Sequence, residues 1–256
     1  MVGGLDKFRE RFARFSDNFV IIGGTACDEI LRDTEMRPRA TMDIDIVVIV
    51  ENMTAEFAKA FWTFIAEGKY RPGVRKNQDD TPKYVLYSFD HGNPGFPVKI
   101  ELLSRHNEIF SSAAYTEPLP INGEVSSLST IILDEPYYNL TVGNSFVSNG
   151  LRYATPLALM ALKARAYINL LSDKEAGRQV NTKDIMKHRN DVLKLAATMT
   201  GTEQIAVEQE IVGTINEFSE RLLGTLPNQS LQDALRSSET ALRLYLESLP
   251  TFYTVR

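Results

Sequence analysis

Apolar positions along the chain follow two different periods, and this divides it into a strand-and-helix part and a helical part. Runs of β-branched or alternating apolar residues predict strands at residues 19–22, 44–50, 83–89 and 97–103. Apolar residues spaced three and four apart predict helices at residues 5–16, 25–33 and 54–67, the last capped by Thr54. From residue 118 to 154, Asn-Gly and Gly-Asn pairs between β-prone runs predict short strands and hairpins.

After Thr155 the pattern is helical to the end of the chain. Thr155 followed by Pro156 is a typical helix start, and a long apolar helix, LALMALKARAYINLL, is expected to follow. Thr182 is expected to cap the next helix, and two more are predicted at about 203–223 and 231–246. We therefore predict an α+β protein with a mixed β-sheet flanked by helices and then a C-terminal helical bundle, divided into domains at 1–154 and 155–256.

Composition narrows the class of protein. The 256 residues are 43% hydrophobic, which is ample for a packed core, and no apolar run is long enough to cross a bilayer. The single cysteine, Cys27, excludes an intrachain disulfide and is consistent with a reducing cytoplasm, where we expect the protein to reside. A formal charge of −5 argues against an extended nucleic-acid-binding surface, but it is compatible with a local basic patch that binds one RNA end or a nucleoside triphosphate.

Candidate chemistry is concentrated between Phe19 and Val50. Gly23 and Gly24 lie between a predicted strand and a predicted helix, where bare backbone N–H groups can approach an anion. Asp43 and Asp45 alternate along the next strand, so both carboxylates share one face. Such a pair repels unless a cation lies between them, and oxygen ligands favour Mg²⁺ or Mn²⁺. Each of the two motifs alone has a simpler explanation: the glycines could form an ordinary tight turn, and the aspartates could lie on an exposed strand face.

A third acid and several basic residues extend the candidate site. Glu101 alternates with apolar residues on the strand VKIELL and shares its face with Lys99. An edge-strand surface position is the alternative for Glu101. Lys163 interrupts an apolar helix, which indicates either a snorkelling side chain or one that faces a site. Arg37 and Arg39 are either solvated loop charges or contacts to a phosphate or an acceptor.

These motifs resemble those of a known group of enzymes. IIGGTACDEIL followed by TMDIDIVV resembles the signature of the DNA polymerase beta-like nucleotidyltransferase superfamily, and KIELL is similar to its third-carboxylate strand. The segments TPLALMALKARAYINL and NTKDIMKHRNDVLKLA are similar to the helical part of bacterial minimal nucleotidyltransferases, including the AbiEii toxin group. The resemblance covers roughly residues 19–197, and many relatives have aspartate where this chain has Glu101.

The resemblance implies a role for each matching residue. Asp43, Asp45 and Glu101 would be the catalytic acids and would bind Mg²⁺ or Mn²⁺, with Glu101 orienting or deprotonating the attacking hydroxyl. The residues implied to contact the nucleotide are Gly23, Gly24, Thr25, Lys163, Lys183 and Asp184. The expected reaction moves a nucleoside monophosphate from a nucleoside triphosphate to a hydroxyl acceptor, such as a small molecule, an RNA end or a protein; an antitoxin partner is also implied. Two alternatives stay open: a catalytically weak nucleotide-binding protein on the same fold, and a glycosyltransferase that uses the Asp-X-Asp triplet.

Overall fold

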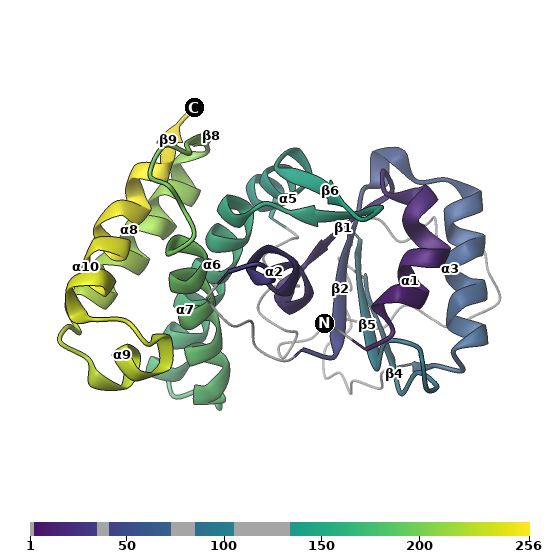
Figure 1. Ribbon diagram of the computed structural model, residues 1–256, viewed down its shortest axis with the longest axis horizontal. Helices are drawn as coiled ribbons and strands as arrows, with labels where there is room; N and C mark the ends of the chain where they lie inside the picture. Colours follow the sequence, from purple (N-terminus) through teal and green to yellow (C-terminus); the bar gives the residue numbers. More distant parts are fainter. Residues whose placement is uncertain (1–2, 35–40, 73–84, 105–133) are drawn as a thin grey trace.

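The computed structural model describes residues 3–34, 41–72, 85–104 and 134–256 (Figure 1). Within these ranges a seven-stranded mixed sheet has the order β3-β4-β5-β2-β1-β7-β6. Its strands are β1 (Phe19–Ile22), β2 (Asp43–Val48), β3 (Arg71–Pro72), β4 (Val85–Asp90), β5 (Lys99–Ser104), β6 (Ser145–Ser148) and β7 (Leu151–Ala154). β2 runs parallel to β5 and antiparallel to β1, while β1 runs parallel to β7.

Helices cover both faces of this sheet. α1 (Leu5–Phe12) and α3 (Ala55–Glu67) lie on one side, and α2 (Gly23–Leu31) lies on the other, between the sheet and the C-terminal helices (Figure 1). Thr54 caps α3 by accepting a hydrogen bond from the backbone N–H of Phe57, as the sequence predicts. α1 and α3 pack through aromatic residues: the ring centroid of Phe12 lies 4.4 Å from that of Phe8 and 5.3 Å from that of Phe64. Phe8 and Phe12 also contact the ring of Phe19, which attaches α1 to β1 of the sheet.

The C-terminal part is mostly helical. Its helices are α6 (Pro156–Glu175), α7 (Thr182–Ala196), α8 (Gln209–Leu223), α9 (Gln229–Leu235) and α10 (Glu239–Ser248). Thr155 caps α6 as expected, but the cap of α7 is Asn181, whose side chain accepts from the N–H of Lys183, and Thr182 is the first helical residue. The domain boundary predicted at 154/155 coincides with the end of β7 and the start of α6, and as a division into domains it stays a prediction.

Two expected C-terminal helices are shorter than the sequence indicates. The segment predicted to begin the first is a strand, β8 (Ile205–Val207), which pairs in parallel with β9 (Tyr253–Val255). The second is divided, because Arg236 adopts a left-handed conformation (φ 52°) that ends α9, and Ser238 then caps α10.

One predicted strand region forms a helix instead. Residues 118–133 lie outside the described ranges, but α5 (Glu135–Gly143) occupies a stretch whose tyrosines and threonine favour strands. Tertiary contacts override that preference: the Tyr137 hydroxyl lies 2.8 Å from the Thr214 hydroxyl, and the Tyr138 hydroxyl donates to Glu51 at 2.8 Å. The Asn149-Gly150 turn does connect a hairpin, β6 to β7, as predicted.

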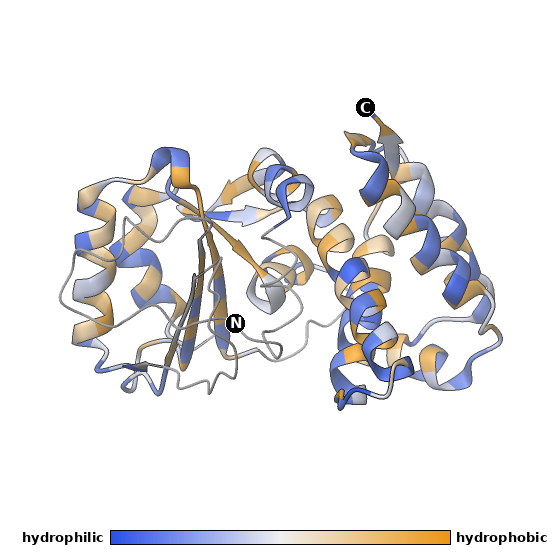
Figure 2. Cartoon of the chain, turned by 180° about the vertical axis from the view of Figure 1, so that it is seen from behind, coloured by the Kyte–Doolittle hydropathy of each residue, from blue (hydrophilic) through white to orange (hydrophobic). Residues whose placement is uncertain are grey.

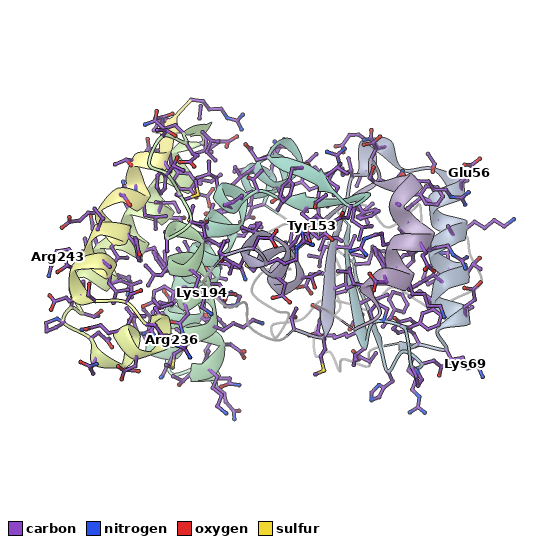
Figure 3. All side chains as sticks on the ribbon, viewed as in Figure 1. Glu56, Lys69, Tyr153, Lys194, Arg236 and Arg243 are labelled. Atoms are coloured by element: carbon purple, nitrogen blue, oxygen red, sulfur yellow. The ribbon has the colours of Figure 1, made fainter. Side chains whose placement is uncertain are left out.

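Apolar and hydrophilic residues are separated between the inside and the outside of the molecule. Apolar residues concentrate on the strands and on the inner sides of the helices, and hydrophilic residues lie outward (Figure 2). On α10, for example, Arg243 points away from the bundle and pairs with Glu239 at 3.3 Å (Figure 3). In the ranges described, no helix has both the length and the apolar character needed to cross a membrane. The predicted fold class, a mixed sheet with flanking helices followed by a helical C-terminal part, is confirmed.

Candidate functional site

The register between β2 and β5 brings the three predicted acids to one face of the sheet. Asp43 lies opposite Lys99 and Asp45 lies opposite Glu101 on the parallel neighbouring strand. Paired residues of adjacent strands project to the same side, and residues two apart share that side. Asp43, Asp45 and Glu101 therefore share one face of the sheet with Lys99.

Asp45 and Glu101 are electrostatically coupled. Glu101 is buried, with its side chain 6% exposed, and the two carboxyl groups share a hydrogen bond. Burial, followed by the charge and the hydrogen bond of Glu101, raises the pKa of Asp45 to about 7, while the charge of Lys187 acts in the opposite direction. At neutral pH this pair is therefore poised to share a proton or to accept a cation.

Gly23 brings the start of α2 directly onto Asp45. The helix begins at Gly23 itself, which has a left-handed backbone conformation (φ 69°). A Cβ atom at this position would lie 1.9 Å from Asp45 Oδ2, so a side chain there would collide with the carboxylate. The backbone N–H groups of the first turn of α2, which include that of Gly24, have no intrahelical partners and are the anion-binding end of the helix.

Thr25 ties this helix to the first carboxylate strand. Its buried hydroxyl donates to the backbone carbonyl oxygen of Asp43 at 2.6 Å. The side chain predicted to contact nucleotide is thus engaged in holding α2 against β2. Any contact between Thr25 and a nucleotide stays a prediction.

Two charged residues of the same face were not predicted as site residues. Lys99 Nζ donates to Glu101 Oε1 at 2.6 Å, and Asp90 of β4 lies opposite Lys99 in the antiparallel register. Burial opposes the charge of Lys99, but the hydrogen bond to Glu101 and the charges of Glu101, Asp43 and Asp90 outweigh it and raise the Lys99 pKa. Alternation along β5 places Lys99 beside Glu101 in the sequence alone; Asp90 depends on the β4–β5 register, which the sequence does not give.

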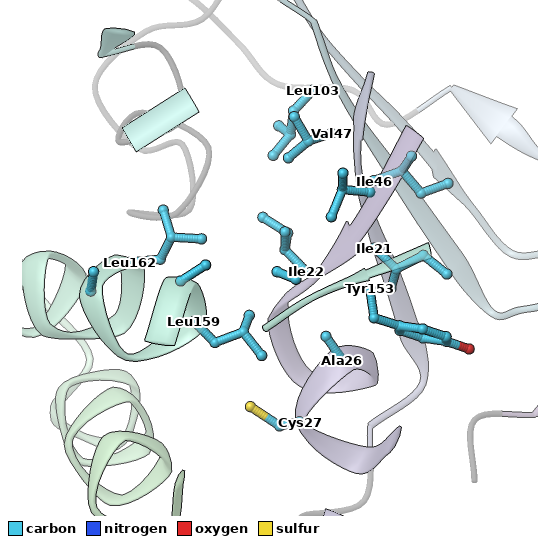
Figure 4. Packing of buried hydrophobic residues seen from close by; sticks show 14 of the residues in the cluster. Ile21, Ile22, Ala26, Cys27, Ile46, Val47, Leu103, Tyr153, Leu159 and Leu162 are labelled. Carbon is cyan, nitrogen blue, oxygen red and sulfur yellow. The ribbon is translucent and has the colours of Figure 1, made fainter. Parts of the chain in front are cut away.

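Lys163 is deeply buried between helices. Its side chain is 0% exposed, and Nζ donates to Asp191 Oδ2 on α7 at 2.7 Å. It also hydrogen-bonds the thiol of Cys27 on α2, and Figure 4 shows that thiol directed toward α6 near Leu159. Burial raises the pKa of the Cys27 thiol to about 12, which fits its predicted place in the core. The predicted contact of Lys163 with a triphosphate stays a prediction.

The other two predicted helical residues lie in the first turn of α7. Lys183 and Asp184 are both exposed. Lys187, one turn later, is half-buried, and its charge acts on Asp45. Helical spacing groups Lys183, Lys187 and Asp191 on one face, but the rotation of α7 determines which of them approaches the acids. Arg37 and Arg39 lie outside the described residues.

Comparison with known proteins adds to this geometry. A family model described as nucleotidyl transferase AbiEii toxin, type IV TA system, matches residues 8–251, which is nearly the whole chain. The chain belongs to the AbiEii family. This confirms the resemblance drawn from the glycine and aspartate motifs, and the family description supports nucleotidyl transfer in the broad sense and a place in a toxin–antitoxin system. No curated protein and no solved structure matches the chain.

The acidic face of this AbiEii protein suits a divalent cation in its donor chemistry. Asp43, Asp45 and Glu101 offer only oxygen ligands, which Mg²⁺ and Mn²⁺ prefer. The pKa of Asp45 is raised by burial and by the negative charge of Glu101, and a cation would offset that charge. Within the described ranges, however, no group of three or more acidic, histidine or cysteine side chains is arranged to hold a metal ion as it stands. One oxygen of Glu101 is engaged by Lys99 instead.

The raised pKa of Asp45 predicts a specific pH dependence of stability. The folded state keeps a proton on Asp45 up to about pH 7, whereas the unfolded chain releases it near its ordinary pKa of 3.8. The free energy of unfolding therefore rises as pH falls from 8 to 6, by about 1.4 kcal/mol from this group, or roughly 3 °C in melting temperature. Calorimetry at both pH values, without metal, measures it.

Asp45→Asn should remove this pH slope and should be more stable than the native protein at pH 8, because asparagine buries no charge and does not repel Glu101. Asp33→Asn, which changes an aspartate whose side chain is 87% exposed, is the matched control and should keep the slope. A slope of the same size in Asp45→Asn would show that another group causes it.

Proposed function

We propose that this protein transfers a nucleoside monophosphate from a nucleoside triphosphate to a hydroxyl acceptor and releases pyrophosphate. Three carboxylates on one face of the sheet, directly beside the N-terminal end of α2, support this reaction. The membership in the AbiEii family supports the same reaction class. The acceptor is a small molecule, an RNA end or a protein.

In this proposal different residues bind the triphosphate, bind the metal ion and activate the acceptor hydroxyl. The N–H groups at Gly23 and Gly24 bind the triphosphate at the positive end of α2. Asp43 and Asp45, with Glu101, would hold Mg²⁺ or Mn²⁺, which would neutralise phosphate charge and lower the pKa of the acceptor hydroxyl. Glu101 orients that hydroxyl and takes its proton as the oxygen bonds to the α-phosphorus. The bond from the α-phosphorus to its bridging oxygen breaks, and pyrophosphate leaves.

Lys187 is a further candidate for the nucleotide side of the site. Its charge reaches Asp45 from α7, whereas Lys183 and Asp184 lie exposed one turn earlier. We assign Lys187 to the phosphates that bind beside Asp45, and Lys183 and Asp184 to the outer wall. An antitoxin partner, implied by the family description, belongs to the same proposal.

Transfer is tested directly with triphosphates that carry the label on the α-phosphate. The full chain is incubated with Mg²⁺, each of the four nucleotides, and acceptors such as total tRNA. Label should move to an acceptor, and Asp43→Asn with Asp45→Asn should lower the rate at least about a hundredfold. The control Asp33→Asn should transfer at the native rate.

Three results would contradict the proposal. They are transfer that survives the double substitution, movement of γ-label instead of α-label, and tight nucleotide binding without transfer to any acceptor. The last would favour the catalytically weak binding protein. Thermal stabilisation by UDP-sugars but not by triphosphates would favour a glycosyltransferase.

A further inference from the structure

Lys99 lies at the centre of the acidic face. It is the first residue of β5, and the register places Asp43 opposite it on β2 and Asp90 opposite it on β4. Its Nζ donates to Glu101 Oε1 at 2.6 Å, with the Lys99 side chain 25% exposed and that of Glu101 6% exposed. One ammonium group is therefore surrounded by carboxylates from three neighbouring strands.

The contact between Lys99 and Glu101 has a consequence for cation binding. The Glu101 oxygen that accepts from Lys99 is one that a divalent ion would need as a ligand. An ammonium and a divalent ion on the same carboxylate would repel strongly in this half-buried setting, because two like charges a few ångströms apart interact by several kcal/mol at intermediate dielectric. The two cations therefore compete for Glu101.

We propose that Lys99 is a positioning residue that holds Glu101 as a built-in counter-ion and competes with a divalent cation for this carboxylate. The lysine holds Glu101 in place through this contact, and it keeps the affinity of the acidic face for free metal low. Glu101 joins a metal only when the ammonium moves away, for which the neighbouring carboxylate of Asp90 is a ready alternative partner. This inference rests on the proposed ligand role of Asp43, Asp45 and Glu101, but not on the transfer reaction.

A purely structural role of Lys99 makes the opposite prediction. If the contact with Glu101 only stabilised the strand, its removal would lower the melting temperature and would leave metal affinity unchanged or weaker, since Glu101 would lose its anchor. Competition predicts tighter metal binding. Metal affinity therefore separates the two roles.

The test measures Mn²⁺ binding to the full chain without nucleotide, by titration calorimetry and by the loss of the free Mn²⁺ signal in electron paramagnetic resonance. Lys99→Met should bind Mn²⁺ at least about tenfold more tightly than the native chain, because it removes the ammonium that engages Glu101 Oε1. Lys99→Arg keeps the charge and should bind like the native chain. Lys59→Met on α3, which changes an exposed lysine, should also leave the affinity unchanged.

A double-substitution cycle with Glu101→Gln locates the effect. If Lys99 competes for Glu101, replacing Lys99 by methionine in the Glu101→Gln background should change Mn²⁺ affinity by less than about threefold. Lys99→Gln is the second variant if Lys99→Met does not give a cooperative melting transition. An unchanged or weaker Mn²⁺ affinity in the folded variant, or a full tightening that persists with Glu101→Gln, would overturn the inference.

These outcomes are distinct from failure of the proposed function. Tighter Mn²⁺ binding by Lys99→Met in a chain that transfers no nucleotide would support the inference and contradict the transfer reaction. Transfer by a chain whose Mn²⁺ affinity does not respond to Lys99→Met would do the reverse.

Discussion

Replacing Lys163 with alanine is expected to lower the free energy of unfolding by about 3–5 kcal/mol, because the substitution removes one member of a buried ion pair, the ammonium that donates to Asp191. The pair is held at 2.7 Å, with the two side chains 0% and 8% exposed. For a chain of this length the loss corresponds to a fall in melting temperature on the order of 10 °C. Chemical denaturation with urea, monitored by circular dichroism, measures it.

Lys174→Ala on the same helix is the matched control. That lysine is exposed, its ammonium donates to Thr182 at 2.9 Å, and its removal should change stability by less than about 0.5 kcal/mol. Asp191→Leu alone should destabilise about as much as Lys163→Ala. Lys163→Met combined with Asp191→Leu should recover most of the loss, since an apolar pair of similar volume replaces a buried ion pair. A cost below about 1 kcal/mol for Lys163→Ala would contradict the buried-pair assignment.

The same double variant also tests the predicted contact between Lys163 and a triphosphate. If the lysine acts only through Asp191, the stable double variant should bind nucleotide as the native chain does. Weak nucleotide binding by a well-folded Lys163→Met, Asp191→Leu chain would assign Lys163 to the phosphates. Lys163 also contacts Cys27 on α2, the helix that begins at Gly23. If the Lys163–Asp191 pair positions the phosphate-binding end of α2, Asp191→Leu alone should also lose part of the nucleotide affinity.

Much of the acidic face could be predicted from the sequence, because it depends on local alternation. Asp43 and Asp45 share a face through the two-residue period of a strand, and Glu101 follows the same rule on its own strand. The position of Gly23 between a strand and a helix is also a local pattern, whereas its left-handed backbone and its close approach to Asp45 are seen only in the structure. What made the prediction sharper than alternation alone was the occurrence of both motifs between Phe19 and Val50.

Other parts of the site depend on geometry that no local pattern contains. The pairing of Lys163 with Asp191 depends on how α6 and α7 are rotated against each other, and the opposition of Asp90 and Lys99 depends on the register of β4 with β5. Helical spacing permits Lys183 or Lys187 to face the acids, and only the placement of α7 decides between them. The α5 helix shows the same limit, because its strand-forming tyrosines are held by hydrogen bonds to distant segments.

Replacing Gly23 with alanine is expected to disable the site and to destabilise the fold. The new Cβ would lie 1.9 Å from Asp45 Oδ2 and 3.0 Å from Asp45 Cγ, so the carboxylate would have to leave its present position. The left-handed backbone conformation of residue 23 adds a cost of about 1–2 kcal/mol for any residue with a side chain. We expect nucleotide transfer to fall at least about a hundredfold and the free energy of unfolding to fall by about 1–3 kcal/mol.

A double-substitution cycle separates the collision from the backbone strain in Gly23→Ala. In an Asp45→Ala background the carboxylate oxygen is absent, so adding Gly23→Ala should cost only the strain of the left-handed backbone, about 1–2 kcal/mol in unfolding free energy. Gly213→Ala on α8, where a Cβ meets nothing within 4 Å, is the control; it should raise stability by up to about 1 kcal/mol and leave transfer unchanged. If Gly23→Ala lowered the free energy of unfolding equally in both backgrounds, the Asp45 side chain would be able to move away from the new methyl group without a measurable cost. In that case the close approach of α2 to the carboxylate would not be what fixes the position of Asp45.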